Sequence, residues 1–141
     1  MGGDTYYSCK YQKMGMKYQL SFCEIEQLSE SIFEVTTVEG AVVDQNCARE
    51  ANDFWINLRS EPFSLLVNNK NSFSFSFTGS VEIAKNPLRK KTAVLLSSKM
   101  TEGDVRMTLD IKKSANFSEQ TRLFDSRTGA LQWLSVDEAQ A

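Results

Sequence analysis

Two short apolar runs constrain the fold of this chain more than any other feature, and both lie within residues 62–98. The runs, at 63–67 and 93–96, contain few polar residues. Such runs are typical of strands that are covered on both faces of a sheet. A segment that alternates serine with phenylalanine, a glycine and an expected short helix lie between them. A strand, a crossover and a second strand predict a parallel pair.

The composition indicates one globular domain. The chain has 141 residues, close to the size of an ordinary domain, and 41% of them are hydrophobic, which suffices for a packed core. A net charge of −2 argues against nucleic-acid binding, which needs concentrated Lys and Arg. The basic cluster Arg89-Lys90-Lys91 is expected to be a solvated turn. No apolar run approaches the length of a transmembrane helix.

Histidine and cysteine usage limits the chemistry that the chain can perform. The sequence has no histidine, so the commonest general base and the commonest zinc ligand are missing. The three cysteines, Cys9, Cys23 and Cys47, are far apart and form no CxxC pair. This spacing supports neither a metal site nor a disulfide framework. We therefore expect reduced thiols in a cytoplasmic protein that holds no metal and no cofactor.

The first half of the chain predicts two strands and a helix after a polar start. Residues 1–15 lack the apolar run of a signal peptide and are expected to be an extension, disordered or foreign to the native protein, ahead of a single domain at 16–141. Segment 18–25 alternates in hydrophobicity, and segment 32–39 is rich in β-branched residues, so we expect two antiparallel strands. Asp44 has the character of an N-cap. Apolar residues then follow at the spacing of one helix face: Cys47, Ala51, Phe54, Trp55 and Leu58.

The second half predicts three more strands and three more helices. Pro62 ends the first helix and opens the strand at 63–67, and segment 72–77, although its alternation fits a strand, is expected to be a loop that leads into a short helix. Strands are expected at 92–96 and 121–124. Segment 101–113 combines a capping-box pattern with a strand-like alternation, and its length favours a helix. The last helix is expected to have Asp125 or Ser126 as its N-cap and to bury Ala130, Trp133 and Leu134.

The predicted order is β-β-α-β-α-β-α-β-α, which describes an α/β fold with a mixed, mostly parallel five-stranded sheet and about four helices. In addition to this order, three stretches of the sequence carry a resemblance to a known family. They are Glu82-Ile83-Ala84-Lys85, the strand AVLLSS, and Arg122-Leu123-Phe124-Asp125 followed by Ala130-Leu131-Gln132-Trp133-Leu134. With them, residues 16–136 resemble the STAS domain and, more closely, the small bacterial SpoIIAA-like and Sec14-like proteins.

The resemblance implies a phosphorylation site. In anti-sigma antagonists, a serine or threonine at the start of the helix after the third strand is phosphorylated within the motif Asp-Ser-Ser-Gly. The corresponding residues here are Ser76-Phe77-Thr78-Gly79, so Thr78 and then Ser76 are the candidates, although Ser76 and Phe77 depart from the motif. Free N–H groups at a helix N-terminus would stabilise the phosphate. The alternative, which we favour, is that Thr78 caps the helix.

Three phenylalanines, Phe73, Phe75 and Phe77, form a candidate partner or ligand surface next to Gly79. In a loop, an exposed ring would bind a protein partner, a membrane surface or an acyl chain, whereas the favoured alternative is that the rings cover the edge of the core. The Sec14-like side of the resemblance implies a small apolar ligand. The residues that would line its pocket, unless they belong to the core, are Met100, Met107 and Leu109.

These features favour a non-catalytic regulatory module that docks to a protein partner, gated by phosphorylation at the start of the second helix. The alternative is a module that binds a small apolar ligand or lipid. An enzyme would need scattered carboxylates such as Asp53, Glu82 or Asp104, which are more often solvated helix residues, so no catalytic residue is expected. An edge strand or the phenylalanine segment could mediate a homodimer.

Overall fold

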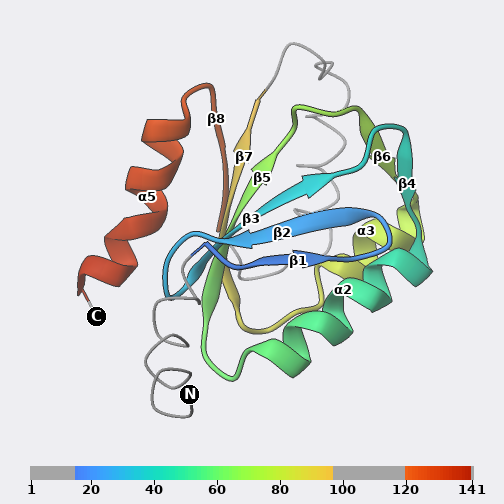
Figure 1. The fold of residues 1–141 in the computed structure, drawn as a ribbon, viewed down its shortest axis with the longest axis horizontal. Coiled ribbons are helices and arrows are strands. Elements are labelled where there is room, and N and C mark those ends of the chain that lie inside the picture. The colour runs from blue at the N-terminus through green and yellow to red at the C-terminus, as the bar shows by residue number, and fades with distance from the viewer. Residues whose placement is uncertain (1–14, 97–119, 141) are drawn as a thin grey trace, which may run out of the picture.

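The computed structural model describes residues 15–96 and 120–140, and its elements form three layers (Figure 1). A six-stranded sheet lies in the middle. Helices α2 (Gln45–Leu58) and α3 (Phe77–Ile83) cover one face, and α5 (Arg127–Gln140) covers the other. Two buried clusters, one on each face, join the sheet to these helices.

The strand order of the central sheet is β1-β2-β3-β5-β7-β8. The strands are β1 (Lys17–Gln19), β2 (Cys23–Gln27), β3 (Ile32–Thr37), β5 (Phe63–Asn68), β7 (Arg89–Leu95) and β8 (Gln120–Phe124). The first three pair antiparallel, and β3, β5, β7 and β8 pair parallel. A second sheet joins β4 (Ala41–Val43) in parallel to β6 (Phe73–Phe75). The predicted α/β class and the mixed sheet are confirmed.

The expected count of five strands in the sheet is wrong because the first predicted strand is two strands. A two-residue turn at Ser21 and Phe22 separates β1 from β2, and Leu20 N donates to Cys23 O at 2.8 Å. The hydrophobic alternation continues across this turn, so periodicity did not reveal it. Three helices occur within the described residues, and the expected helix at 101–113 lies outside them, as do residues 1–14.

The expected loop at 72–77 is also wrong. Residues Phe73–Phe75 form β6, whose partner β4 was not predicted from the sequence. Strand β4 has three residues and directly precedes the N-cap Asp44, so it is too short for a periodic signal. Each of the two strands depends on the other for its hydrogen bonds, and they meet only in the tertiary structure.

Helix α2 begins as predicted. The carboxylate of Asp44 accepts a hydrogen bond from Cys47 N at 2.9 Å. Trp55 is 2% exposed and stacks on Phe63 with 4.4 Å between ring centroids, which confirms its expected place in the core. Leu58, expected on the buried face, is exposed because it is the last residue of the helix.

The basic cluster at 89–91 is not a solvated turn. Arg89 and Lys91 belong to β7 and are buried, whereas Lys90 is exposed. Arg89 Nη2 donates to Ile83 O at 2.9 Å, and Lys91 Nζ donates to Trp133 O at 3.1 Å. Long basic side chains can bury their alkyl stems in this way while their charged ends reach backbone carbonyls.

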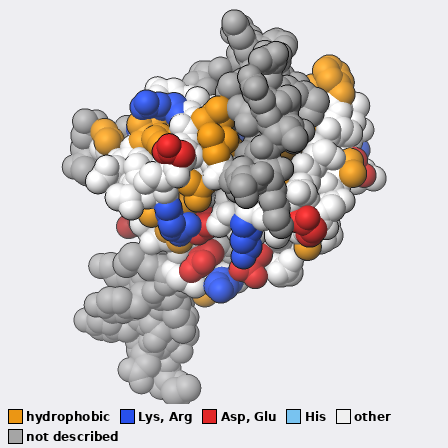
Figure 2. Space-filling view, turned by 90° about the horizontal axis from the view of Figure 1, so that it is seen from above, with side chains coloured by type: hydrophobic (Ala, Val, Ile, Leu, Met, Phe, Trp, Pro, Cys, Tyr) orange, Lys and Arg blue, Asp and Glu red, His pale blue; other side chains and the backbone are white. Residues whose placement is uncertain are grey.

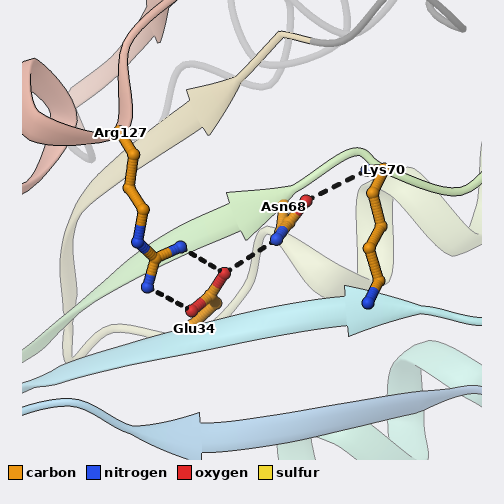
Figure 3. A network of polar contacts seen from close by, with 4 residues as sticks. All are labelled: Glu34, Asn68, Lys70 and Arg127. Carbon is orange, nitrogen blue, oxygen red and sulfur yellow. Dashed lines mark hydrogen bonds and ion pairs between the residues drawn. The ribbon is translucent and has the colours of Figure 1, made fainter.

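An ion pair ties the start of α5 to the sheet (Figure 3). Both nitrogens of the Arg127 guanidinium fork lie 2.7 Å from the carboxylate oxygens of Glu34 on β3. Asn68 Nδ2 donates to the same carboxylate at 2.9 Å, and Lys70 N donates to Asn68 Oδ1 at 3.0 Å. These bonds hold the pKa of Glu34 below its ordinary value. Ser126, one of the two expected caps, accepts from Gly129 N at 3.2 Å.

Candidate functional site

A cavity of about 200 Å³ lies between the central sheet and the layer formed by α2, α3 and β6. Its floor is a continuous row of β-branched side chains, Ile25, Val35, Val67 and Val94, which face one another across four adjacent strands. Trp55 of α2, both phenylalanines of β6 and Ile83 of α3 contribute to the walls. The lining is thus mainly hydrocarbon.

The space follows from the sizes of the side chains along the strands. Towards the start of the parallel strands, the rings of Phe33, Trp55 and Phe63 contact one another at 4.4–6.0 Å between centroids and fill the layer. Further along, the floor carries short β-branched side chains, and the short sheet β4–β6 contributes to the layer above it. Short side chains under a thin layer leave a volume that the larger rings do not reach.

The end of the cavity at the carboxyl ends of the parallel strands is polar. Thr37 of β3 pairs with Cys23 of β2, two residues beyond the pair of Val35 and Ile25 in the β-branched row. Asn69, Asn71 and Ser72, which also line the cavity, follow β5 in the chain. Asn71 Nδ2 donates to Thr37 O at 3.0 Å, which holds the loop against β3. Ligands of open α/β sheets typically bind outside the carboxyl ends of the strands.

The lining carries little ionisable chemistry. Burial raises the pKa of the Cys23 thiol to about 12, so this wall of the cavity is neutral at physiological pH. The guanidinium of Arg89 donates to a backbone carbonyl, as described above. Among residues 15–96 and 120–140, no group of three or more His, Cys, Asp or Glu side chains is placed to hold a metal ion. The arrangement is suited to binding rather than to acid–base chemistry.

Ser76, not Thr78, caps α3. Ser76 has an extended backbone, and its Oγ accepts from Gly79 N at 3.0 Å. The expected cap at Thr78 is wrong because Thr78 lies inside the first helical turn, where it is exposed with its Oγ1 3.3 Å from Ser76 Oγ. Gly79 is buried because α3 approaches β4 closely, and a Cβ at this position would lie 2.0 Å from Val43 O.

The three phenylalanines separate into two environments. Phe73 and Phe75 point to one face of β6, pack against the core and line the cavity. Phe77 starts α3, so the strand period ends before it, and its side chain is 73% exposed. Met100, Met107 and Leu109, the other expected lining residues, lie outside the described residues.

Sequence reasoning missed most of the cavity. It placed Val67 and Val94 on buried strands but could not align them with Ile25 and Val35, because register between distant strands leaves no mark in either segment. Polar residues such as Asn69 and Asn71 are common in the turns that follow strands, so their residue types alone did not indicate a site. Their position at the end of a parallel strand is the signal that could have identified them.

Figure 2 shows the molecule from above, with Lys and Arg side chains lying beside Asp and Glu side chains and small groups of hydrophobic side chains between them. The charge on this face is therefore mixed in sign. Separately, no helix in the described part of the chain is long and apolar enough to cross a membrane.

No protein-family model matches the sequence, and no curated protein matches it significantly. Among solved structures, the chain is similar to an uncharacterized protein from the DUF3478 family of Shewanella loihica PV-4, which has a SpoIIAA-like fold. The two chains share 12% identity with a TM-score of 0.53, and the match covers 85% of this chain and 99% of that one. Together with the strand order and the helices on both faces, this similarity shows that the chain has a SpoIIAA-like fold.

Proposed function

We propose that this chain is a non-catalytic module that binds a small apolar molecule in the cavity between the sheet and helices α2 and α3. The cavity itself carries the proposal. Protein interiors are close-packed, and voids larger than a water molecule are few. A volume of about 200 Å³ is space for about seven waters at roughly 30 Å³ each.

The energetics of this apolar lining support an apolar occupant. Contact of the mainly hydrocarbon lining with water costs roughly 25 cal/mol per Å² of apolar surface. An engineered apolar cavity of about 150 Å³ stays dry and binds benzene or xenon. A ligand with a similar apolar body would recover part of this cost by restoring the missing dispersion contacts.

The lining supports binding without catalysis. A catalytic role would need a nucleophile or a general base within reach of the ligand. The two ionisable lining residues are a protonated thiol, Cys23, and a guanidinium, Arg89, and neither serves in those roles.

The cysteines support a cytoplasmic location. Cys23 and Cys47 are both free thiols, as is usual in a reducing compartment.

The test is calorimetric binding of benzene to a matched pair of variants. Val67→Phe places a ring in the cavity floor, whereas Val42→Phe makes the same change at a side chain that is 57% exposed on β4. We expect benzene to bind the wild type and Val42→Phe equally and to bind Val67→Phe at least about tenfold more weakly, with both variants folded by circular dichroism. Equal binding to all three proteins, or no binding to the wild type, would contradict the proposal.

A second candidate function, docking to a protein partner, has its own supporting observation. Phe77 and Val42 are 73% and 57% exposed, and their elements meet where Ser76 N donates to Val43 O at 3.1 Å. Exposed apolar side chains close to the exposed Thr78 hydroxyl would suit a partner whose binding responds to phosphorylation.

This candidate is tested by intact mass spectrometry of protein purified from its own source. One added phosphoryl group, mapped by fragmentation to Thr78 or Ser76, would favour docking gated by phosphorylation. A chain of unmodified mass would count against the gate. A small molecule that stays bound under native conditions and is lost on denaturation would instead favour the ligand-binding function.

A further inference from the structure

The lining of the cavity changes character along the direction of the parallel strands. The apolar floor row includes Val35 of β3, and the next residue of this strand on the same face is Thr37. Two residues of a strand span about 6.6 Å, so the polar end begins one such step beyond the hydrocarbon row. An occupant that spans both zones needs an apolar body and a polar group at one end.

The polar groups at this end are uncharged. They are the side chains of Thr37, Asn69, Asn71 and Ser72. Hydroxyl and amide groups can both donate and accept hydrogen bonds, so they suit a neutral head group. A charged head group buried here without a counter-charge would pay a much larger desolvation cost.

The charged residues that lie nearest in sequence to the polar end of the cavity also disfavour an anionic head group. The carboxylate of Glu39 accepts from Ser72 N at 2.6 Å, which places a negative charge beside the polar end. Lys70 lies in the same loop, but its side chain extends to the β3 strand that carries Glu34 (Figure 3). Its positive charge there helps to lower the pKa of Glu34. Glu34 points to the face of the sheet that α5 covers, away from the cavity.

The cationic lining residue, Arg89, belongs to the opposite end of the cavity. It starts β7 in register with Phe63, the first residue of β5, whereas the polar loop follows the last residue of β5. Its guanidinium is already bonded to Ile83 O. Arg89 and the polar loop therefore lie at opposite ends of the β-branched row.

We propose, on the basis of the proposed function, that the ligand is a small neutral amphipathic molecule. Its apolar body of about six to eight carbons lies on the β-branched row, a size set by comparison with benzene in a cavity of roughly 150 Å³. Its single hydroxyl, carbonyl or amide group lies among the side chains of Thr37, Asn69, Asn71 and Ser72.

The experiment compares three probes that share one ring: toluene, benzyl alcohol and benzoate. Their affinities are measured by calorimetry for the wild type and for two variants. Thr37→Val removes the buried hydroxyl in the cavity floor, and Ser72→Ala removes an exposed hydroxyl in the loop after β5. The second variant keeps the test valid should Thr37→Val fail to fold. Lys70→Ala, in the same loop with its side chain outside the cavity lining, is the control.

We expect at least one of the two polar variants to weaken benzyl alcohol binding about three- to tenfold, as for the loss of one hydrogen bond, while toluene binding changes less than about twofold. Benzoate is expected to bind the wild type at least about tenfold more weakly than benzyl alcohol. Benzoate binding as tightly as benzyl alcohol would overturn the inference in favour of an anion held by Arg89. Equal benzyl alcohol affinity in the wild type and both polar variants would overturn it too, whereas failure of all three probes to bind the wild type would overturn the proposed function itself.

Discussion

The two faces of the central sheet are covered in different ways. On the face of α2 and α3, the core is built from large rings, with Phe33, Trp55 and Phe63 in contact, and it leaves the cavity further along the strands. On the face of α5, the buried side chains are small and aliphatic, among them the fully buried Ala93 and Ala130, and the partly buried rings of Phe124 and Trp133 pack against them. That face is also tied by the ion pair between Glu34 and Arg127 (Figure 3).

The difference follows from the packing of large and small side chains. Small residues let a helix contact a sheet closely, and a charge pair can then fix the position of the helix. Large rings separate the layers, and where the rings end the separation remains, so a volume stays open. We infer that the α5 face mainly holds the fold together and that the other face carries the binding site. Substitutions on the two faces test this division.

The largest effect is expected for Trp55→Ala on the ring-filled face. Trp55 is 2% exposed, and its removal should lower the free energy of unfolding by about 3–5 kcal/mol while enlarging the cavity. Leu134→Ala on the α5 face should cost about 2–5 kcal/mol. Urea unfolding measures both costs. We expect benzene binding to change in Trp55→Ala and not in Leu134→Ala. An equal change in both variants would contradict the inference that only the face of α2 and α3 carries the binding site.

Gly79→Ala should cost about 3 kcal/mol, the upper end of the usual range for overpacking. Its new Cβ would lie 2.0 Å from the Val43 carbonyl oxygen, so α3 and β4 must move apart. Gly129→Ala is the matched control, because the nearest atom to its new Cβ lies at 3.7 Å, which is ordinary contact. Thermal unfolding compares the two variants. Similar melting temperatures would show that the close approach at Gly79 is not a constraint.

Glu34→Gln should cost about 2 kcal/mol at pH 7, as expected for lost hydrogen bonds to a charged group. Arg127 and Asn68 lower the pKa of Glu34 in the folded protein from its ordinary value of 4.5. The stabilisation is therefore present above pH 4.5 and is lost as the pH falls through the lower folded-state pKa. Urea unfolding of the wild type and the variant at pH 7 and in steps down to about pH 3 should show their difference shrinking.

Glu24→Gln is the control for this ion pair. Glu24 lies on β2 of the same sheet and forms a 4.0 Å pair with Lys17 in which both side chains are about half exposed or more. Exposed pairs contribute about 0–1 kcal/mol, so this change should be close to neutral at every pH. A pH-independent cost for Glu34→Gln would indicate that its packing, not its charge, supports α5.

The smallest effect is expected for Phe77→Ala. This ring is 73% exposed, so its loss should change the free energy of unfolding by less than about 0.5 kcal/mol. Phe75→Ala, two residues earlier in the same serine–phenylalanine run, removes a half-buried ring from the cavity wall. It should cost about 1.5–3 kcal/mol and alter benzene binding. Equal costs for the two variants would contradict the assignment of Phe75 to the cavity and Phe77 to the surface.

Local patterns predicted the elements that carry their own signals. The strand at 63–67, helix α2 with its cap at Asp44, and the buried Ala130 and Leu134 of α5 were all found, because capping chemistry and helical or apolar periodicity are properties of short segments. The turn after Leu20 was missed because its flanking strands happen to keep one alternation. Burial of Lys91 was missed because its partner is the carbonyl of Trp133, 42 residues further along the chain.

The α/β class, the order of most elements and the apolar character of the central strands can be read from the sequence alone, since each depends on neighbours within about four residues along the chain. Three other features exist only in the folded chain: β4 pairs with β6, the side chains of Ile25, Val35, Val67 and Val94 form one row, and this row ends at polar groups. These features depend on register between segments tens of residues apart. A change of one residue in that register would turn every side chain of a strand to the opposite face and remove the cavity floor.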